Sequence, residues 1–149
     1  YHSNDPATGA VSGKLYNWYA VKLLQMDIDY YNAANLTSPW GWRVSTNEDF
    51  NILVAHLGGA SIAGSKMKKE GIVYWSSSNV DSDNSSGLSL LGSGYRSFGS
   101  NGAFGGYTAE YSGWVVNGEL VKLFSNSSAC STTLGEGKRA GHPLRLIKA

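Results

Sequence analysis

A lone cysteine and three histidines are the residues of this sequence whose side chains could act as nucleophile or base. Cys130 lies in a run of Ser, Ala and Thr, with no acidic residue or histidine close to it. A reactive thiol needs a lowered pKa, which nearby positive charge or a helix N-terminus provides. His2, His56 and His142 are widely separated, and their spacing from Ser and Asp indicates no catalytic triad. We therefore predict a protein that is not an enzyme, with His56 at a helix end and His142 on the surface.

An oxygen-rich segment at 79–87 has the spacing of a calcium loop, because Asp81 and Asp83 alternate with other residues. The distal Glu that would complete an EF-hand site is missing. We therefore favour a polar surface turn and expect no cofactor. Calcium near Asp81 and Asp83 is the less favoured alternative.

The C-terminal half has the composition of a binding surface. Tyr, Ser, Gly, Asn and Ala dominate residues 98–112 and 125–134. Tyr provides contact area at low entropic cost, and Ser or Asn provides adaptable hydrogen bonds, which is why antibody loops use the same residues. Short connections between strands also use Gly and Ser. Composition therefore favours binding but leaves the simpler explanation open.

The elements that would position such a surface begin with a helix predicted at 46–57. Ser45 with Glu48 forms a capping box, and apolar residues recur at i, i+3, i+4 and i+7 from Phe50. Gly58 and the glycine after it supply a left-handed stop. Residues 63–68 are predicted as a short second helix.

The rest of the chain is predicted as strands and loops. Aromatic and β-branched residues that alternate at 10–22 indicate a strand. Residues 27–42 are typical of an irregular connection, and residues 76–87 of a surface loop. After Tyr95 the pattern predicts short strands at 107–111, 113–116, 120–124 and 144–147.

Length and composition predict one ordered domain over residues 1–149, excised from a longer chain because Tyr1 is not an initiator Met. A net charge of +1 without runs of like charge argues against nucleic acid and anionic membranes as partners. No apolar run approaches the ~20 residues of a membrane span. The lone cysteine excludes an internal disulfide and favours a bacterial or phage source.

Several short motifs occur together and in a fixed order: 15–21, Gly-Trp-Arg-Val at 41–44, 47–50, 57–59, 63–68, Trp75 with Asn79, 86–89, 94–96, Trp114 and 141–148. In this order they resemble the Fibrobacter succinogenes major paralogous domain family, over nearly the whole chain from about residue 13. The resemblance implies a C-type-lectin-like fold, related to the fold of formylglycine-generating enzymes. We therefore expect an α+β domain with one main helix, a short second helix and a twisted antiparallel sheet.

Relatives of this family include surface lipoproteins and the variable proteins of diversity-generating retroelements, whose C-terminal segment is mutagenised to change ligand specificity. This sequence departs from the family pattern at 106–110, where a tryptophan is missing, and at 141–145. The resemblance and the composition together place these residues on the ligand-binding face: Phe98, Phe104, Tyr107, Ala109, Tyr111, Ser125, Ser128, Cys130 and His142. Trp18, Trp42, Trp75, Trp114 and Arg145 are expected in the scaffold, and Arg96 with Glu110 as an ion pair.

The resemblance favours a non-enzymatic ligand-binding domain, the variable protein of a diversity-generating retroelement, on a bacterial surface or a phage virion and hence extracellular. Its partner is expected to be a protein or glycan on another surface. One alternative is a fixed adhesive or structural module of a bacterial surface lipoprotein. Another is a divergent enzyme of the formylglycine-generating type, which would use Cys130.

Overall fold

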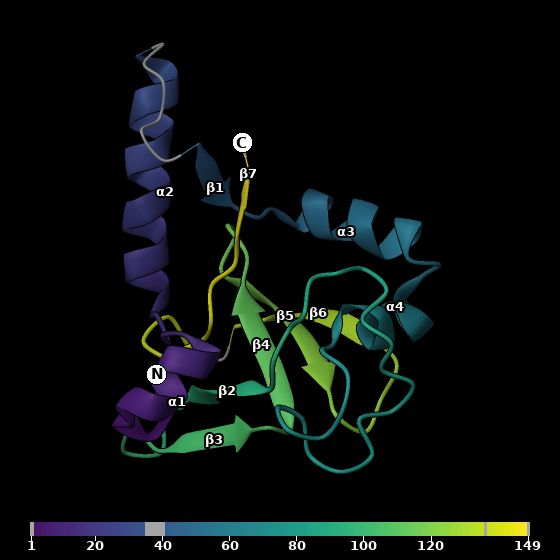
Figure 1. The fold of residues 1–149 in the computed structure, drawn as a ribbon. Coiled ribbons are helices and arrows are strands. Elements are labelled where there is room, and N and C mark those ends of the chain that lie inside the picture. Colours follow the sequence, from purple (N-terminus) through teal and green to yellow (C-terminus); the bar gives the residue numbers. More distant parts are fainter. Residues whose placement is uncertain (1, 35–40, 136, 149) are drawn as a thin grey trace.

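The chain folds as an α+β structure, which confirms the predicted fold class. The computed structural model describes residues 2–34, 41–135 and 137–148, and Figure 1 shows their arrangement. The helices are η1 (His2–Asn4), α1 (Pro6–Ser12), α2 (Trp18–Ala33), α3 (Asn47–His56) and α4 (Ala60–Met67). The strands are β1 (Trp42–Val44), β2 (Ser93–Arg96), β3 (Phe104–Tyr107), β4 (Glu110–Trp114), β5 (Glu119–Phe124), β6 (Cys130–Leu134) and β7 (Leu146–Lys148).

The strands form a five-stranded sheet in the order β3-β2-β4-β5-β6 and a separate two-stranded sheet of β1 and β7. The large sheet is mixed, so the predicted antiparallel sheet needs correction: β2 and β4 run parallel where Gly94 pairs with Tyr111. The connection from β3 to β4 passes Gly92, whose carbonyl accepts the Thr108 amide at 2.7 Å. A Cβ on Gly92 would lie 2.7 Å from the Thr108 carbonyl carbon, so this crossing requires glycine.

The longest helix, α2, has 16 residues and was not predicted. The strand expected at 10–22 is wrong, as is the irregular connection from residue 27, because the chain there is α1, a short link and α2. The apolar residues around Tyr19 and Val21 belong to a helical pattern that continues to Ile28. This pattern extends past residue 22, where the predicted strand ends. Asn17 marks the helix start, because its Oδ1 accepts the Ala20 amide at 2.9 Å as an N-cap does. Residues 35–40 of the expected connection lie outside the described residues.

The predicted helix at 46–57 is confirmed as α3, with its capping box one residue later than expected. The Thr46 hydroxyl accepts the Asp49 amide at 3.1 Å, and the Asp49 carboxylate accepts the Thr46 amide at 2.8 Å. Arg43 on β1 binds both Asp49 oxygens at 2.6 and 2.7 Å, and this pair holds the pKa of Asp49 well below its usual range. Gly58 follows with a positive φ of 97° and ends the helix.

The short second helix is also confirmed, as α4, although it begins at Ala60 rather than Ala63. It packs closely on the chain before β6. A Cβ on Gly64 would lie 2.3 Å from the Ala129 carbonyl oxygen, so α4 can approach only through a glycine.

The core has two parts. One lies between α3, α4 and the large sheet around Trp75, Met67 and Leu123, and the other lies between α2, β1 and the sheet around Trp18 and Trp114. These three tryptophans are buried as expected. Two scaffold predictions are wrong: Trp42 is 48% exposed, and Arg145 is exposed. Trp42 pairs with Lys148 at one end of the two-stranded sheet, and Val44 pairs with Leu146 at the other.

In the C-terminal half, the strand at 120–124 is confirmed, and those at 113–116 and 144–147 overlap β4 and β7. The strand expected at 107–111 is divided, because Thr108 adopts a positive φ of 60° and turns the chain between β3 and β4. β6 was not predicted, since its Ser and Thr residues are typical of a loop. Among the described residues, no helix is both long and apolar enough to cross a membrane.

Candidate ligand-binding site

The nine residues predicted for the ligand-binding face do not form one surface. Tyr111, Ser125, Cys130 and His142 are buried, and their prediction as ligand contacts is corrected on that ground. Strands β4 and β6 turn Tyr111 and Cys130 into the core beside Leu123, which accounts for two of them. The other five are exposed or half-buried: Phe98, Phe104, Tyr107, Ala109 and Ser128.

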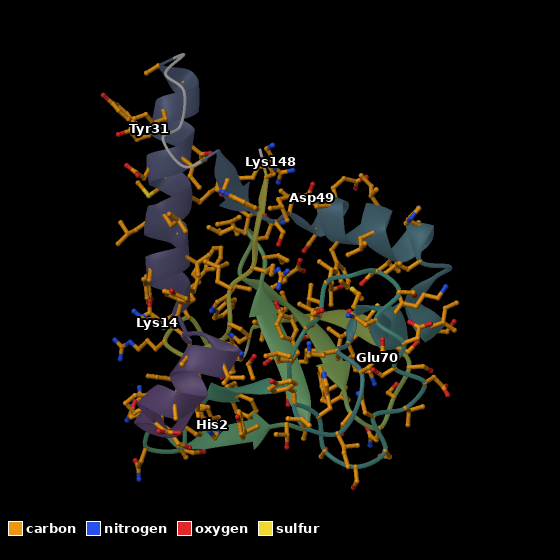
Figure 2. The ribbon with its side chains drawn as sticks, in the orientation of Figure 1. His2, Lys14, Tyr31, Asp49, Glu70 and Lys148 are labelled. Atoms are coloured by element: carbon orange, nitrogen blue, oxygen red, sulfur yellow. The ribbon has the colours of Figure 1, made fainter. Side chains whose placement is uncertain are left out.

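Three of these five are aromatic and lie at the β2–β3 end of the sheet, next to the N-terminal segment. His2 stacks on Tyr107 with ring centroids 4.9 Å apart and lies 5.1 Å from the ring of Phe104. Figure 2 shows His2 at this end of the molecule, beside β3 and α1. Phe98 follows β2 directly and is 54% exposed. The N-terminal segment therefore packs against the aromatic residues at the β2–β3 end of the sheet.

A polar pocket of about 230 Å³ opens beside the aromatic residues. Its walls come from η1, the link before α2, the ends of β2 and β3, and the segment before β7. The lining residues are Asn4, Leu15, Asn17, Arg96, Phe104, Arg139 and Gly141.

Arg96 is held in this pocket by backbone pairing and by an aromatic ring. Its amide and carbonyl exchange hydrogen bonds of 2.8 Å with Gly141, and its guanidinium carbon lies 5.9 Å from the centre of the Phe104 ring. Gly102 leaves room for the side chain, because a Cβ there would lie 2.3 Å from a guanidinium nitrogen. The guanidinium carbon of Arg139 lies 5.4 Å from the centre of the Phe98 ring. Cation–π contacts of this kind orient a guanidinium without neutralising it.

The opposite wall is fixed by the chain that enters α2. Tyr16 and His142 exchange backbone hydrogen bonds of 2.8 and 3.0 Å, and the Trp18 amide donates to the Lys138 carbonyl at 2.9 Å. Asn17 both lines the pocket and caps α2, so the positive end of that helix dipole lies at the pocket edge. The pocket therefore has a rigid frame on both sides.

The charge in this pocket has no carboxylate partner among the described residues. The ion pairs within that part of the chain are Arg43–Asp49 and Lys122–Glu110, and neither involves a pocket arginine. The expected Arg96–Glu110 pair is wrong, because the Glu110 carboxylate lies 3.6 Å from the Lys122 ammonium instead. No described Asp or Glu lines the pocket either. Two guanidinium groups thus face a polar space without a compensating anion.

The comparison with known families decides where this chain belongs. The sequence profile described as the Fibrobacter succinogenes major domain matches residues 1–148, almost the entire chain. The chain belongs to the Fibrobacter succinogenes major domain family. No curated protein and no solved structure matches it.

A second charged region of this Fibrobacter succinogenes major domain lies at the C-terminal end of α4, where Lys68 is fully buried. Its ammonium donates to the carbonyls of Val80, Phe124 and Ser127 at 3.3, 3.1 and 2.9 Å. It also lies 5.5 Å from the centre of the Trp75 ring. Burial lowers the pKa of Lys68, and the nearby Asp81 carboxylate opposes that shift. Lys68 ties the 76–87 loop to β5 and to the chain after it.

The predicted surface loop at 76–87 contains no helix or strand, as expected, but it is tied down by hydrogen bonds. The Asn79 amide donates to the carbonyls of Lys69 and Gly71 at 2.9 and 2.8 Å. Asp83 accepts the Ser85 amide at 2.9 Å, and Asp81 faces the Lys68 charge rather than another acidic ligand. No group of three or more His, Cys, Asp or Glu that could hold a metal ion occurs in the described ranges.

Ser125 and Ser128 belong to this second region of the domain rather than to the arginine pocket. The Ser125 hydroxyl accepts a hydrogen bond from Ser76 at 2.8 Å, and its carbonyl accepts the Val80 amide at 2.9 Å. The Ser128 carbonyl accepts the Ser65 amide at 3.0 Å. These serines join the loop, α4 and the sheet.

His142 is another buried side chain of a type that can act as a base. The prediction that it lies on the surface is wrong. Its Nδ1 lies 3.0 Å from the Ser112 hydroxyl, and its ring packs on Tyr95 and Trp114. Burial, and then the nearby Lys122 ammonium, lower the pKa of His142 to about 4. A small pocket of about 40 Å³ lies beside it, large enough for a water molecule or two. Ser112 is fully buried, so this Ser–His pair lies inside the core.

The remaining nucleophile, Cys130, is buried at the start of β6, and burial raises the pKa of its thiol. A catalytic cysteine requires the opposite shift. His56 lies in the last turn of α3 and is exposed, as the sequence predicted.

Of the seven residues that line the pocket, sequence reasoning placed only Phe104 on the ligand-binding face, and it missed the polar ones: Asn4, Asn17, Arg96 and Arg139. Composition drew attention to Tyr and Ser in the C-terminal half, whereas one wall of the pocket is N-terminal. One usable signal was that the chain has only four arginines. Arg43 lies just before the acidic first turn of a helix and pairs there with Asp49. Arg96 and Arg145 have no acidic residue close to them in the sequence, whereas Glu136 lies three residues before Arg139. Asn17 before an apolar helical pattern was a second usable signal.

Proposed function

We propose that this domain is a non-enzymatic ligand-binding module and that its site is the pocket lined by Arg96 and Arg139. The observation that carries the proposal is that two oriented guanidinium groups face one polar pocket without a carboxylate among the described residues. A guanidinium presents a planar fork of donors that matches a carboxylate or sulfate group. The ligand is therefore an anionic group displayed on a glycan or a protein.

The surroundings of the pocket supply the rest of a recognition surface. Phe98, Phe104 and Tyr107 offer aromatic faces for the apolar side of a sugar ring or for a peptide side chain. Asn4 and Asn17 carry amides that can bind hydroxyl or carbonyl groups of the ligand. Ala109 is exposed in the turn after β3, at the edge of the same end of the sheet.

The proposal extends to the fold and the setting implied by the family resemblance: a C-type-lectin-like domain outside the cell, on a bacterial surface or a phage virion. It also includes the role of variable protein in a diversity-generating retroelement. Buried positions such as Tyr111 and His142 tolerate random replacement poorly, because protein cores are close-packed. Diversification would therefore act on the candidates that are exposed or half-buried, namely Phe98, Phe104, Tyr107, Ala109 and Ser128.

Calorimetric titration with defined probes tests the binding function. The probes are an oligosaccharide of hexuronic acid, a sulfated oligosaccharide, a neutral oligosaccharide of equal length and a glutamate-rich peptide. We expect an anionic probe to bind and the neutral one not to bind. Arg96→Gln and Arg139→Gln should each weaken binding about 10-fold or more, the value of a charge-assisted hydrogen bond. Arg145→Gln, an exposed arginine outside the pocket, is the matched control.

Binding of an anionic probe that survives both pocket substitutions would contradict this site.

Sequencing the coding region across a growing population tests the variable-protein role separately. Substitutions concentrated at exposed codons of the C-terminal half, in adenine-bearing positions, would support it. An evenly unchanged locus would refute that role and leave a fixed adhesive module.

A further inference from the structure

Helix α2 is apolar on two opposite sides, and only one of them is covered. On the inner side Trp18, Val21 and Leu24 pack against β1, β7 and the preceding chain through Val44, Leu144 and Leu146. The outer side carries four large exposed side chains: Tyr19 (53%), Leu23 (67%), Met26 (57%) and Tyr30 (67%). A row of large apolar side chains exposed on one face of a helix commonly marks a surface that contacts another protein. The outer side of α2 therefore has no packing partner among the described residues of the single chain.

The spacing of the outer residues indicates what that partner is. They recur at intervals of four, three and four, which is the repeat of residues at the seam of a coiled coil. We propose that the outer side of α2 packs against α2 of a second copy of this chain, in parallel orientation. Figure 1 shows α2 along one edge of the molecule, with no helix or strand of the described residues outside it in this view.

Charge on the flanks of the stripe favours the parallel arrangement. In heptad terms Lys22 occupies a g position and Asp27 the e position five residues later, and these two positions meet across a parallel pair. Both side chains are exposed, and neither forms an ion pair in the described part of the chain. A parallel dimer therefore gains a Lys22–Asp27 pair on each side of the seam.

An antiparallel pair would place Lys22 opposite Asp29 instead. The Asp29 carboxylate already accepts a hydrogen bond from the Gln25 amide at 2.7 Å. Asp27 is thus the better partner for Lys22. The inner face, through Val21 and Ile28, holds the helix against the domain and leaves the outer face free for the second copy.

The stripe is short, which limits the strength of the dimer. Four side chains from each copy cover less than the roughly 1,200–2,000 Å² of a standard stable interface. We therefore expect a reversible dimer whose population depends on concentration. Because Asn17 lies both at the start of α2 and in the arginine pocket, a parallel dimer places two pockets at the same end. Two pockets facing the same way bind a repetitive surface with higher avidity than one.

Sedimentation velocity over a hundredfold range of protein concentration tests the dimer without any ligand, and so separately from the proposed binding function. We expect the weight-average mass to rise from that of one chain, 15.9 kDa, toward twice that value. Leu23→Glu and Met26→Glu should keep the chain monomeric at every concentration. Ile72→Glu, an equally exposed apolar residue in a loop, is the control and should dimerise normally. Circular dichroism verifies that each variant is folded.

Mixing two charge variants tests the orientation. Lys22→Glu places Glu against Asp27 and Asp27→Lys places Lys against Lys22, so each variant alone should lose the dimer. An equimolar mixture should dimerise again, because both flanking pairs then join opposite charges. A wild-type chain that stays monomeric, or a dimer unaffected by Leu23→Glu, would overturn the proposal. Unchanged dimerisation of Asp27→Lys would overturn the parallel orientation.

Discussion

Lys68 and the arginine pair of the pocket show two opposite ways in which this domain handles positive charge. The Lys68 ammonium is fully buried, and three backbone carbonyls satisfy its hydrogen bonds. Arg96 and Arg139 are exposed, their guanidinium groups lie over aromatic rings, and no carboxylate of the described residues pairs with them. A charge whose donors are already used by the protein stabilises the fold. A charge whose donors are unused is available to a ligand.

The largest expected effect lies at Lys68. Lys68→Met removes the ammonium and leaves three buried carbonyls without their donor, which costs about 3 kcal/mol or more in the free energy of unfolding. Lys69→Met is the control, because the half-buried Lys69 loses only its contact with the Tyr74 ring, 5.7 Å away, and stability should change by no more than about 1 kcal/mol. Chemical denaturation measures both. Equal effects of the two substitutions would remove the structural role assigned to Lys68.

His142 gives the next effect, because it is a buried base that stays neutral. Its pKa in the folded domain is about 4, against about 6.5 in the unfolded chain. The unfolded chain therefore binds the proton more readily, so stability is fully present above pH 6.5 and falls as the pH drops toward 4. The loss amounts to about 3 kcal/mol at most.

Denaturation curves at pH 7, 5.5 and 4 measure the contribution of His142. His142→Asn should flatten this part of the pH dependence, whereas His56→Asn, at an exposed helix end, should leave it unchanged. A pH profile that His142→Asn does not alter would show that other groups control acid stability.

Salt concentration should affect ligand binding at the arginine pocket more than the stabilisation that Lys68 provides. Raising the salt concentration from 0.05 to 0.5 M shortens the Debye length from about 14 to about 4 Å and weakens exposed charge interactions much more than buried ones. Binding of an anionic probe at Arg96 should therefore weaken several-fold over this range. The stabilisation that Lys68 provides, measured as the difference between wild type and Lys68→Met, should stay nearly constant. Salt-independent binding would place the ligand contacts elsewhere.

The smallest expected effect concerns the rings that hold the arginines. Phe98→Leu removes the cation–π contact with Arg139 but keeps an apolar side chain, and should weaken binding about two- to fivefold, in line with about 0.5–1 kcal/mol for an exposed contact. Phe124→Leu, another partly exposed phenylalanine outside the pocket, is the control. Calorimetric titration with the same anionic probe detects the difference.

Features that depend on contacts within one short segment could be predicted from the sequence, and features that depend on contacts between distant segments could not. The helix at 46–57 was predictable, because its cap, its apolar stripe and its stop lie within one short segment. Helix α2 was not, since half of its apolar residues face away from the core and obscure the usual amphipathic pattern. The burial of Lys68 and His142 was not predictable either, because their partners come from residues far along the chain. The aromatic part of the site was found from composition, whereas the N-terminal wall depends on contacts between the two ends of the chain.

A nuclear magnetic resonance titration with a hexuronic acid oligosaccharide reports on the arginine pocket and on the surroundings of Lys68 in one experiment. We expect the shifted amide and side-chain signals to belong to Asn4, Asn17, Arg96, Phe104 and Arg139. Signals of Lys68 and Ser125 should stay in place. Shifts around Lys68 with an unchanged arginine pocket would contradict the claim that this domain binds its ligand where its charge is unpaired.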